Sequence, residues 1–256
     1  MTRALTALDC PSTFQPMFEQ IVDDLVHQLK RCVPDLHSVY IAGSIARLEA
    51  VPGRSDLNVT LVTAHALTPS EHAILDSIVS RVEHQWPQIV AVQVTFLMKH
   101  EVLDIAAIFK WGFWLKHCCV CVYGDDLSSR FGCFEPSWEI GKSMNDDLPM
   151  QLNDYRRNIM ATRVVSHYLS LCRDVAKKMI WSCYSLVFHR SGILALSIDQ
   201  AAEQFLTFYP QHKVAIERLF MLVSGQQVPK KAVLFMMNDF GQWIVTEFDK
   251  IERKIG

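Results

Sequence analysis

Long apolar runs are absent from this sequence, and so is any marked excess of charge of one sign. The stretches "IVAVQVTFLM" and "DIAAIFKWGFWL" are too short, or too interrupted by Gln, Asp and Lys, to span a bilayer. The amino-terminal "MTRALTALDCPSTFQP" lacks the apolar core and cleavage site of a secretory signal. The formal net charge is only −2, so a general affinity for nucleic acid is not expected. These absences predict a soluble, cytoplasmic protein that binds neither membranes nor nucleic acid in general.

Metal-binding and disulfide patterns are also lacking. The eight cysteines show no disulfide or zinc framework, and the ten histidines show no metal-ligand spacing on a shared helix or strand. The run "CCVC" is the one place where thiolates could cluster. In a strand, however, Cys119 and Cys121 would share one face while Cys118 would point to the other. We therefore interpret these cysteines as small buried hydrophobes, and the histidines as surface or hydrogen-bonded core residues.

Helical and strand-like patterns alternate in the first half of the chain. Apolar spacings of three and four predict helices over 13–33 and 69–84, and another helix is expected at about 102–116. The stretches "SVYIAG", "DLNVTLVT", "VAVQVTFLM" and "CCVCVYG" are typical of strands. The alternation predicts an α+β region, with a mixed sheet and flanking helices, that ends near residue 127.

The composition changes after this region. Residues 128–148 are rich in Gly, Pro, Ser and Asp, which is typical of a long connection. From 149 onward only helical patterns occur, separated by "HRSG", "YPQH" and "SGQQVP". We therefore predict an α+β domain over 1–127, a linker over 128–148, and an all-α helical bundle domain over 149–256.

A Gly-Ser pair follows the first predicted strand. Gly43 lets the backbone approach a ligand, and the amides that follow it could hold phosphate. Such a dipeptide alone is more often structural. What favours a functional role is the next strand, "DLNVTLVT", whose strict alternation places Asp56 and Asn58 on one polar face, while the third strand offers Gln93. Carboxylates in such positions on adjacent strands could hold Mg²⁺ against a nucleoside triphosphate.

The stretch "GSIARLEAVPGRSDLNV" resembles the signature of the DNA polymerase beta-like nucleotidyltransferase superfamily, which has Gly-Ser, a short gap, and then Asp, apolar, Asp or Glu, apolar. The stretch "CVYGDDL" is similar to the strand and turn that close this domain in small members. "KKMIWSCYSLVFHRSG" and "AAEQFLTFYP" resemble the second domain of bacterial aminoglycoside adenylyltransferases. The resemblance implies that Gly-Ser holds the triphosphate and two carboxylates on one strand bind two Mg²⁺. A third carboxylate, on a nearby strand, would complete the metal site or act as base.

Carried onto this chain, the resemblance matches the Gly-Ser pair, Gly43 and Ser44, and Asp56. Asn58 occupies the second carboxylate position, and Gln93 is the best placement of the third, with Thr95 as the alternative. The amides keep the shape and a carbonyl oxygen, but two negative charges that would balance Mg²⁺ are lost. An amide also cannot act as a general base, a role worth about 10²–10⁴-fold in rate.

Other candidates flank the motif or lie in the helical half. Arg54 and Ser55 adjoin the Gly-Ser loop and are candidate nucleotide-binding residues, as is Arg47. In the resembled family, basic residues of the helical domain reach the phosphates across an interdomain cleft, which makes Lys177 the main candidate there. A solvated face is the alternative for this lysine and for three further cations, Arg156, Arg163 and Lys178, of which the two arginines are expected to share one helix face.

Acids elsewhere could replace the missing carboxylates. Asp104 is retained as such a substitute, but it and the others are expected to be solvated or capping carboxylates, namely Glu49, Glu101, Asp125 and Asp126. The aromatic run "FKWGFW" at 109–114 could stack a base, although packing in the core is favoured.

Three functional hypotheses follow. The first is a degenerate nucleotidyltransferase that binds a nucleotide or phosphate ligand in the interdomain cleft, as a sensor or interaction module, with metal-dependent transfer weakened or lost. The second is an active Mg²⁺-dependent adenylyltransferase that uses Asp56 and modifies a hydroxyl of a small molecule or protein. The third is a structural or interaction protein with an empty cleft. Asn58 and Gln93 favour the first over the second. The retained Gly43, Ser44 and Asp56 argue against the third.

Overall fold

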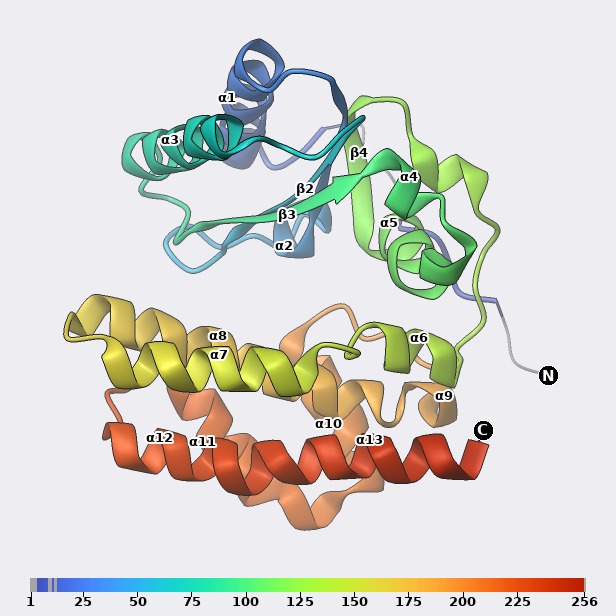
Figure 1. Cartoon of the computed structure of the whole chain (residues 1–256), viewed down its shortest axis with the longest axis vertical. Coiled ribbons are helices and arrows are strands. Elements are labelled where there is room, and N and C mark those ends of the chain that lie inside the picture. The colour runs from blue at the N-terminus through green and yellow to red at the C-terminus, as the bar shows by residue number, and fades with distance from the viewer. Residues whose placement is uncertain (1–3, 9–10, 12, 256) are drawn as a thin grey trace. The chain divides into compact units, whose positions relative to one another are not determined.

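The computed structural model describes residues 4–8, 11 and 13–255. The chain divides into two compact units, one formed by Ala4–Phe134 and the other running from Glu135 onward (Figure 1). Among the described residues, none of the helices combines the length and apolar character that crossing a bilayer requires. The predicted division into domains stays a prediction, because compactness alone does not test independent folding.

Four strands form one mixed sheet in the first unit: β1 (Leu36–Ala42), β2 (Leu57–Thr63), β3 (Val92–Met98) and β4 (Cys119–Gly124). Their order is β3-β2-β1-β4, with β1 antiparallel to both β2 and β4, and β2 parallel to β3. All four lie within a few residues of the predicted stretches. The prediction of an α+β fold with a mixed sheet is therefore confirmed.

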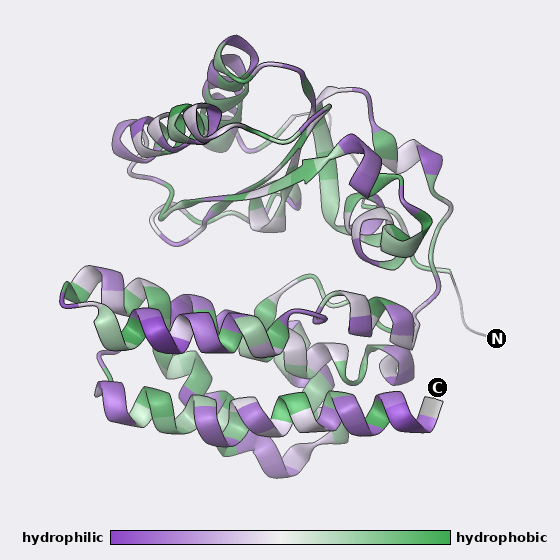
Figure 2. Ribbon diagram, in the orientation of Figure 1, coloured by the Kyte–Doolittle hydropathy of each residue, from purple (hydrophilic) through white to green (hydrophobic). Residues whose placement is uncertain are grey.

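One face of the sheet is covered by α1 (Pro16–Cys32) and α3 (Pro69–Gln85), whose apolar sides pack on inward residues of the strands such as Val39, Ile41 and Leu61. Helix α3 begins with a capping box, in which the Thr68 hydroxyl accepts from the Glu71 amide at 3.3 Å and the Glu71 carboxylate accepts from the Thr68 amide at 2.6 Å. Figure 2 shows strands of the sheet coloured largely as apolar. This layer forms the larger core of the unit.

The opposite face is only partly covered. Its core joins Tyr40, Val62 and Leu97 of the strands to Leu115 of α5 (Phe113–Cys118). The partly buried Trp111 and Trp114 pack against this core, so the core interpretation of "FKWGFW" holds for these two residues, whereas Phe109 is exposed. The helix predicted at about 102–116 is found only in part, because the chain forms a series of short helical segments there: α4 (Lys99–Val102), a 3-10 turn (Ile105–Ala107), a π turn (Ile108–Gly112) and then α5.

The run "CCVC" crosses an element boundary. Cys118 is the last residue of α5, so it does not alternate with Cys119 in the strand as predicted. Burial raises the pKa of the Cys118 thiol to about 12 and also raises the pKa of Cys119. Both thiols therefore stay protonated at neutral pH and behave as small core residues. Cys10 lies outside the described residues.

The elements of the second unit are helical within the described part of the chain. They are α6 (Trp138–Ser143), α7 (Leu148–Ala161), α8 (Val165–Ser185), α9 (Phe188–Ser191), α10 (Ile198–Phe208), a 3-10 turn (Pro210–His212), α11 (Lys213–Val223), α12 (Lys230–Met236), a π turn (Met237–Gly241) and α13 (Gln242–Ile255). Helix α8 is central, with Val175, Ala176, Met179 and Ile180 fully buried. Figure 2 shows apolar and polar residues alternating along α13, as expected of an amphipathic helix.

Residues 128–148, for which a linker is predicted, contain short helical elements. A 3-10 turn covers Leu127–Arg130, and α6 begins after Ser137, whose hydroxyl accepts from the Ile140 amide at 3.4 Å. A Cβ at Gly141 would lie 2.6 Å from the Ser185 carbonyl oxygen, so α6 packs tightly on the end of α8. The Trp138 indole N–H also donates to Glu252 of α13 at 2.7 Å. Tertiary packing thus stabilises a helix too short to show periodicity.

Candidate functional site

The Gly-Ser pair lies where β1 ends, at the start of the four-residue helix α2 (Gly43–Ala46). Gly43 has φ +76°, in the left-handed region that favours glycine. A Cβ added at Gly43 would lie 2.6 Å from the side-chain nitrogen of Asn58. The backbone conformation therefore favours glycine at this position, a Cβ there would have to displace the end of the Asn58 side chain, and that side chain lies directly against the Gly43 backbone.

Strand pairing places Asn58 between the Gly-Ser loop and Gln93. Asn58 on β2 pairs with Ala42 on β1 on one side and with Gln93 on β3 on the other. Paired residues point to the same face of a sheet, so the two amides are immediate neighbours. Asn58 is half-buried and Gln93 is exposed.

Thr95, the alternative to Gln93, pairs with Thr60 and not with Asn58. The Thr60 hydroxyl is buried and accepts from the Trp114 indole N–H at 3.1 Å. The covered part of this face therefore begins at Thr60, and the open polar part ends at Asn58 and Gln93. Sequence reasoning missed Trp114 as the residue that delimits the site, although a buried indole N–H generally needs a partner.

Two serines join the Gly-Ser loop to the start of β2. The Ser44 hydroxyl donates to the Ser55 hydroxyl at 3.0 Å, and Ser55 also accepts from the Val51 amide at 2.9 Å. The Gly53 amide donates to the Gln88 carbonyl at 2.7 Å, which anchors the intervening turn. Ser55 thus connects the Gly-Ser pair, through Ser44, to the turn that begins at Val51.

Asp56 follows Ser55 and directly precedes β2, two positions before Asn58, so alternation puts both side chains on the same face. Asp56 is half-buried. The structure therefore gathers one carboxylate, two amides and two hydroxyls near the end of β1 and the starts of β2 and β3. We call this group the polar edge; its members are Ser44, Ser55, Asp56, Asn58 and Gln93.

The other acids considered from the sequence have structural contacts. Glu101 accepts from the Met98 amide at 2.9 Å, and Asp104 accepts from the Ala106 amide at 2.9 Å. Asp126 accepts from the Ser128 amide at 2.9 Å. Glu49 pairs with Arg47 at 2.9 Å, and an Asp125 oxygen lies 3.8 Å from a ring nitrogen of His37. Their expected roles as capping or surface carboxylates are confirmed.

The polar edge does not fit the two Mg²⁺ ions that the resemblance implies. Its only carboxylate is Asp56, and amide oxygens supply no charge to balance a divalent cation. Within residues 4–8, 11 and 13–255, no three His, Cys, Asp or Glu side chains are grouped so that they could hold a metal ion. We therefore derive no chemical step through a metal.

Cationic candidates differ in their surroundings. Arg54 is exposed, in the turn before Ser55. Arg47, with a side chain only 14% exposed, forms the ion pair with Glu49. Lys177 is half-buried on α8, and its predicted phosphate contact, like the interdomain cleft, stays a prediction from the resemblance.

The prediction that Arg156 and Arg163 share a helix face is wrong. Helix α7 ends at Ala161, and the next residue, Thr162, has extended backbone angles. Arg163 therefore lies in the connection to α8, where β-branched residues disfavour helix. Arg156 remains on α7 and donates to the Asn238 side chain at 3.0 Å. Lys178, on α8, lies 3.6 Å from the Asp147 carboxylate.

Comparisons with known proteins support the fold and leave the activity open. No protein-family model matches the sequence, and no curated protein matches it. A solved structure of the spectinomycin adenyltransferase AAD(9) from Enterococcus faecialis, with ATP and spectinomycin, is similar over 90% of this chain and 98% of that chain, with a TM-score of 0.59 and 12% identity. At this identity the likeness shows a shared fold alone, and it supports the predicted nucleotidyltransferase-like fold.

Proposed function

We propose that this chain binds a nucleotide, or a related phosphate ligand, at the polar edge, and that metal-dependent nucleotidyl transfer is weakened or lost. The observation that carries the proposal is the pairing of Asn58 with Gln93 beside Gly43. The shared fold supports it, because the similar adenyltransferase was solved with ATP. A fold by itself does not determine an activity, so the proposal depends on the side chains at the edge.

Amides change the way in which this edge would hold phosphate. A carboxylate repels a phosphate oxygen unless a cation lies between them, whereas the NH₂ group of Asn58 or Gln93 donates to that oxygen directly. The one proton of the Ser44 hydroxyl already goes to Ser55, so Ser44 would donate to phosphate only if that hydrogen bond were released. The polar edge is thus suited to direct hydrogen bonding of phosphate, with Asp56 as its one negative charge.

The amides Asn58 and Gln93, in positions where the resembled family has carboxylates, also leave these positions without a general base. Neither amide can accept a proton from an attacking hydroxyl at neutral pH, and the acids elsewhere already cap turns or form ion pairs. General base assistance is worth about 10²–10⁴-fold in rate. We therefore expect nucleotide binding without appreciable transfer.

The test combines calorimetric titration of the purified full chain, with ATP and with inorganic phosphate, and an assay of pyrophosphate release. ATP binding with and without Mg²⁺, and no pyrophosphate release, would support the proposal. Release that is abolished by Asp56→Asn would instead support an active adenylyltransferase, which the retained Gly43, Ser44 and Asp56 favour. Failure to bind either ligand would favour the third hypothesis, a structural or interaction protein.

A further inference from the structure

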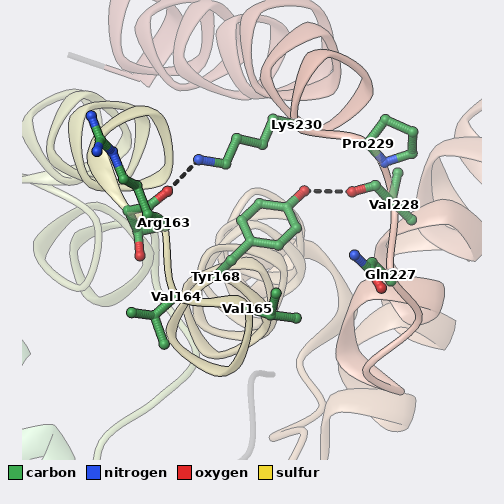
Figure 3. Close-up of a pocket in the computed structure, with 9 residues that line it drawn as sticks. Arg163, Val164, Val165, Tyr168, Gln227, Val228, Pro229 and Lys230 are labelled. Atoms are coloured by element: carbon green, nitrogen blue, oxygen red, sulfur yellow. Dashed lines mark hydrogen bonds between the residues drawn. The ribbon is translucent and has the colours of Figure 1, made fainter.

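A groove of about 570 Å³ lies in the helical unit, between the connection from α7 to α8 and the connection from α11 to α12. Residues 162–165 and Tyr168 line one side, and residues 227–230 line the other (Figure 3). Its volume falls in the range of small-molecule sites, about 300–1,000 Å³. None of these residues belongs to the polar edge, and the inference does not depend on the proposed nucleotide binding.

The walls of the groove are tied together by hydrogen bonds. The Tyr168 hydroxyl donates to the Val228 carbonyl at 2.5 Å, and the tyrosine is only 6% exposed. The Lys230 ammonium donates to the Thr162 carbonyl across the groove, approaches the Met160 carbonyl at 3.5 Å, and lies 5.7 Å from the centre of the Tyr168 ring. These contacts join two connections about 65 residues apart in sequence, so the groove is formed before any ligand binds.

The charge of the lining has one sign. Lys230 and Arg163 are cations, and no acidic side chain is among the residues that line the groove. Figure 3 shows the Lys230 ammonium and Arg163 on one side of the Tyr168 ring, with the Arg163 side chain extending away from the ring, and Gln227 and Val228 on the other side. The Lys230 ammonium has three N–H groups, of which two contact carbonyls, so one is left for a ligand. The guanidinium of the exposed Arg163 has five N–H donors.

The rest of the lining is largely apolar. Val164 and Val165 are 61% and 55% exposed, and they line the groove together with the buried Tyr168. Pro229 adds a rigid apolar surface on the opposite side. A molecule with a flat or branched apolar body would cover these side chains, while an anionic group would meet the two cations.

We propose that this groove binds a small organic anion. Its apolar body contacts Val164, Val165 and Tyr168, and its carboxylate, sulfonate or phosphate accepts hydrogen bonds from Arg163 and Lys230. Such charge-assisted hydrogen bonds are about twice as strong as neutral ones, so the anionic group supplies selectivity over a neutral molecule of the same shape.

Two fluorescent probes with related ring systems test the proposal on the full chain: 1-anilinonaphthalene-8-sulfonate, which is anionic, and N-phenyl-1-naphthylamine, which lacks the sulfonate. We expect one saturable site for the sulfonate, and roughly tenfold weaker binding of it in Arg163→Gln and in Lys230→Gln, as for the loss of one charge-assisted contact. Binding of the neutral probe should be unchanged in Arg163→Gln. Lys231→Gln is the matched control, since Lys231 is exposed and does not line the groove.

A second pair of variants avoids the structural contacts of Lys230. Val165→Glu places a carboxylate beside Tyr168 and should abolish binding of the sulfonate. Val214→Glu, at a valine that is also 55% exposed but lies on α11 outside the groove, should leave it unchanged. Circular dichroism melting curves would identify any variant that fails to fold. Equal sulfonate affinity in wild type, Arg163→Gln and Val165→Glu, or the absence of a saturable site, would overturn the proposal.

Discussion

At the scale of single residues, the polar edge depends on one glycine. Gly43 combines a left-handed backbone conformation with a position in which a Cβ would meet the Asn58 amide at 2.6 Å. The Asn58 side chain is in turn held next to Gln93 by strand pairing. A change at Gly43 would therefore act on the fold through the backbone and on the proposed ligand site through Asn58.

Gly43→Ala is expected to lower the free energy of unfolding by about 1–3 kcal/mol, because a non-glycine residue is strained at positive φ and its methyl group displaces Asn58. It should also weaken the binding of inorganic phosphate. Urea unfolding and calorimetric titration measure the two effects.

Gly132→Ala serves as control, since a Cβ there meets nothing within 4 Å. In the double variant Gly43→Ala, Asn58→Ala the contact with Asn58 is removed and the backbone strain remains. Stability that recovers only in part, relative to Gly43→Ala alone, would therefore separate the two causes. Unchanged stability in Gly43→Ala would contradict the expected backbone strain at this position.

At the scale of elements, regular patterns were predicted well and short elements were not. Strand β2 is predicted by the strict alternation of apolar and polar residues, the other strands by short apolar runs, and α1 and α3 by apolar spacing that continues over several turns. Helix α6, with six residues, shows too little periodicity, and its capping residue Ser137 lies in a segment that resembles a loop in composition. The helix expected over 102–116 is interrupted by π and 3-10 turns. Such interruptions depend on tertiary contacts, which no local pattern contains.

Residue His117 connects α5 to two distant segments. It is fully buried, its Nε2 accepts from the Phe134 amide at 3.0 Å, and its Nδ1 therefore donates to the Thr6 carbonyl at 2.8 Å. Burial lowers the pKa of His117, an effect that the Thr6 hydrogen bond opposes only in part. The folded state thus contains a neutral imidazole over a pH range in which the unfolded chain, with a histidine pKa of about 6.5, is protonated.

Because the unfolded state binds more protons in this range, the free energy of unfolding should fall as the pH decreases below about 6.5. Burial also lowers the pKa of His37, His189 and His212, which adds to the trend. His117→Phe should lower stability at pH 7.5 by about 1–3 kcal/mol, since the Thr6 carbonyl and the Phe134 amide lose their part-buried hydrogen bonds, and should reduce the pH dependence. Thermal unfolding between pH 5 and 7.5 measures both, with His100→Gln at an exposed position as control. A pH dependence as steep in His117→Phe as in wild type would rule out this role.

At the scale of the whole molecule, the sequence motif predicts a fold that the comparison with solved structures supports. The stretch from Gly43 to Asn58 was sufficient to predict a nucleotidyltransferase-like fold, which the likeness to the adenyltransferase supports. The groove in the helical unit could not be predicted in this way, because the two segments that line it, 162–168 and 227–230, lie far apart in sequence and come together only through packing. Local spacing can indicate a site built from one loop and two strands, but not a site built from two distant connections.

The central claim is that the amides at positions 58 and 93 make ligand binding independent of a metal ion. Calorimetric titration with ATP, in Mg²⁺ and in EDTA, tests it most directly. The titration compares wild type with the double variant Asn58→Asp, Gln93→Glu. The control is the double variant Asn158→Asp, Gln20→Glu, which adds the same charges at exposed positions. We predict similar affinities in both buffers for wild type and the control, and at least about tenfold tighter binding in Mg²⁺ than in EDTA for the restored acids. A strict Mg²⁺ requirement in wild type, or an unchanged metal dependence in the variant with restored acids, would contradict the claim.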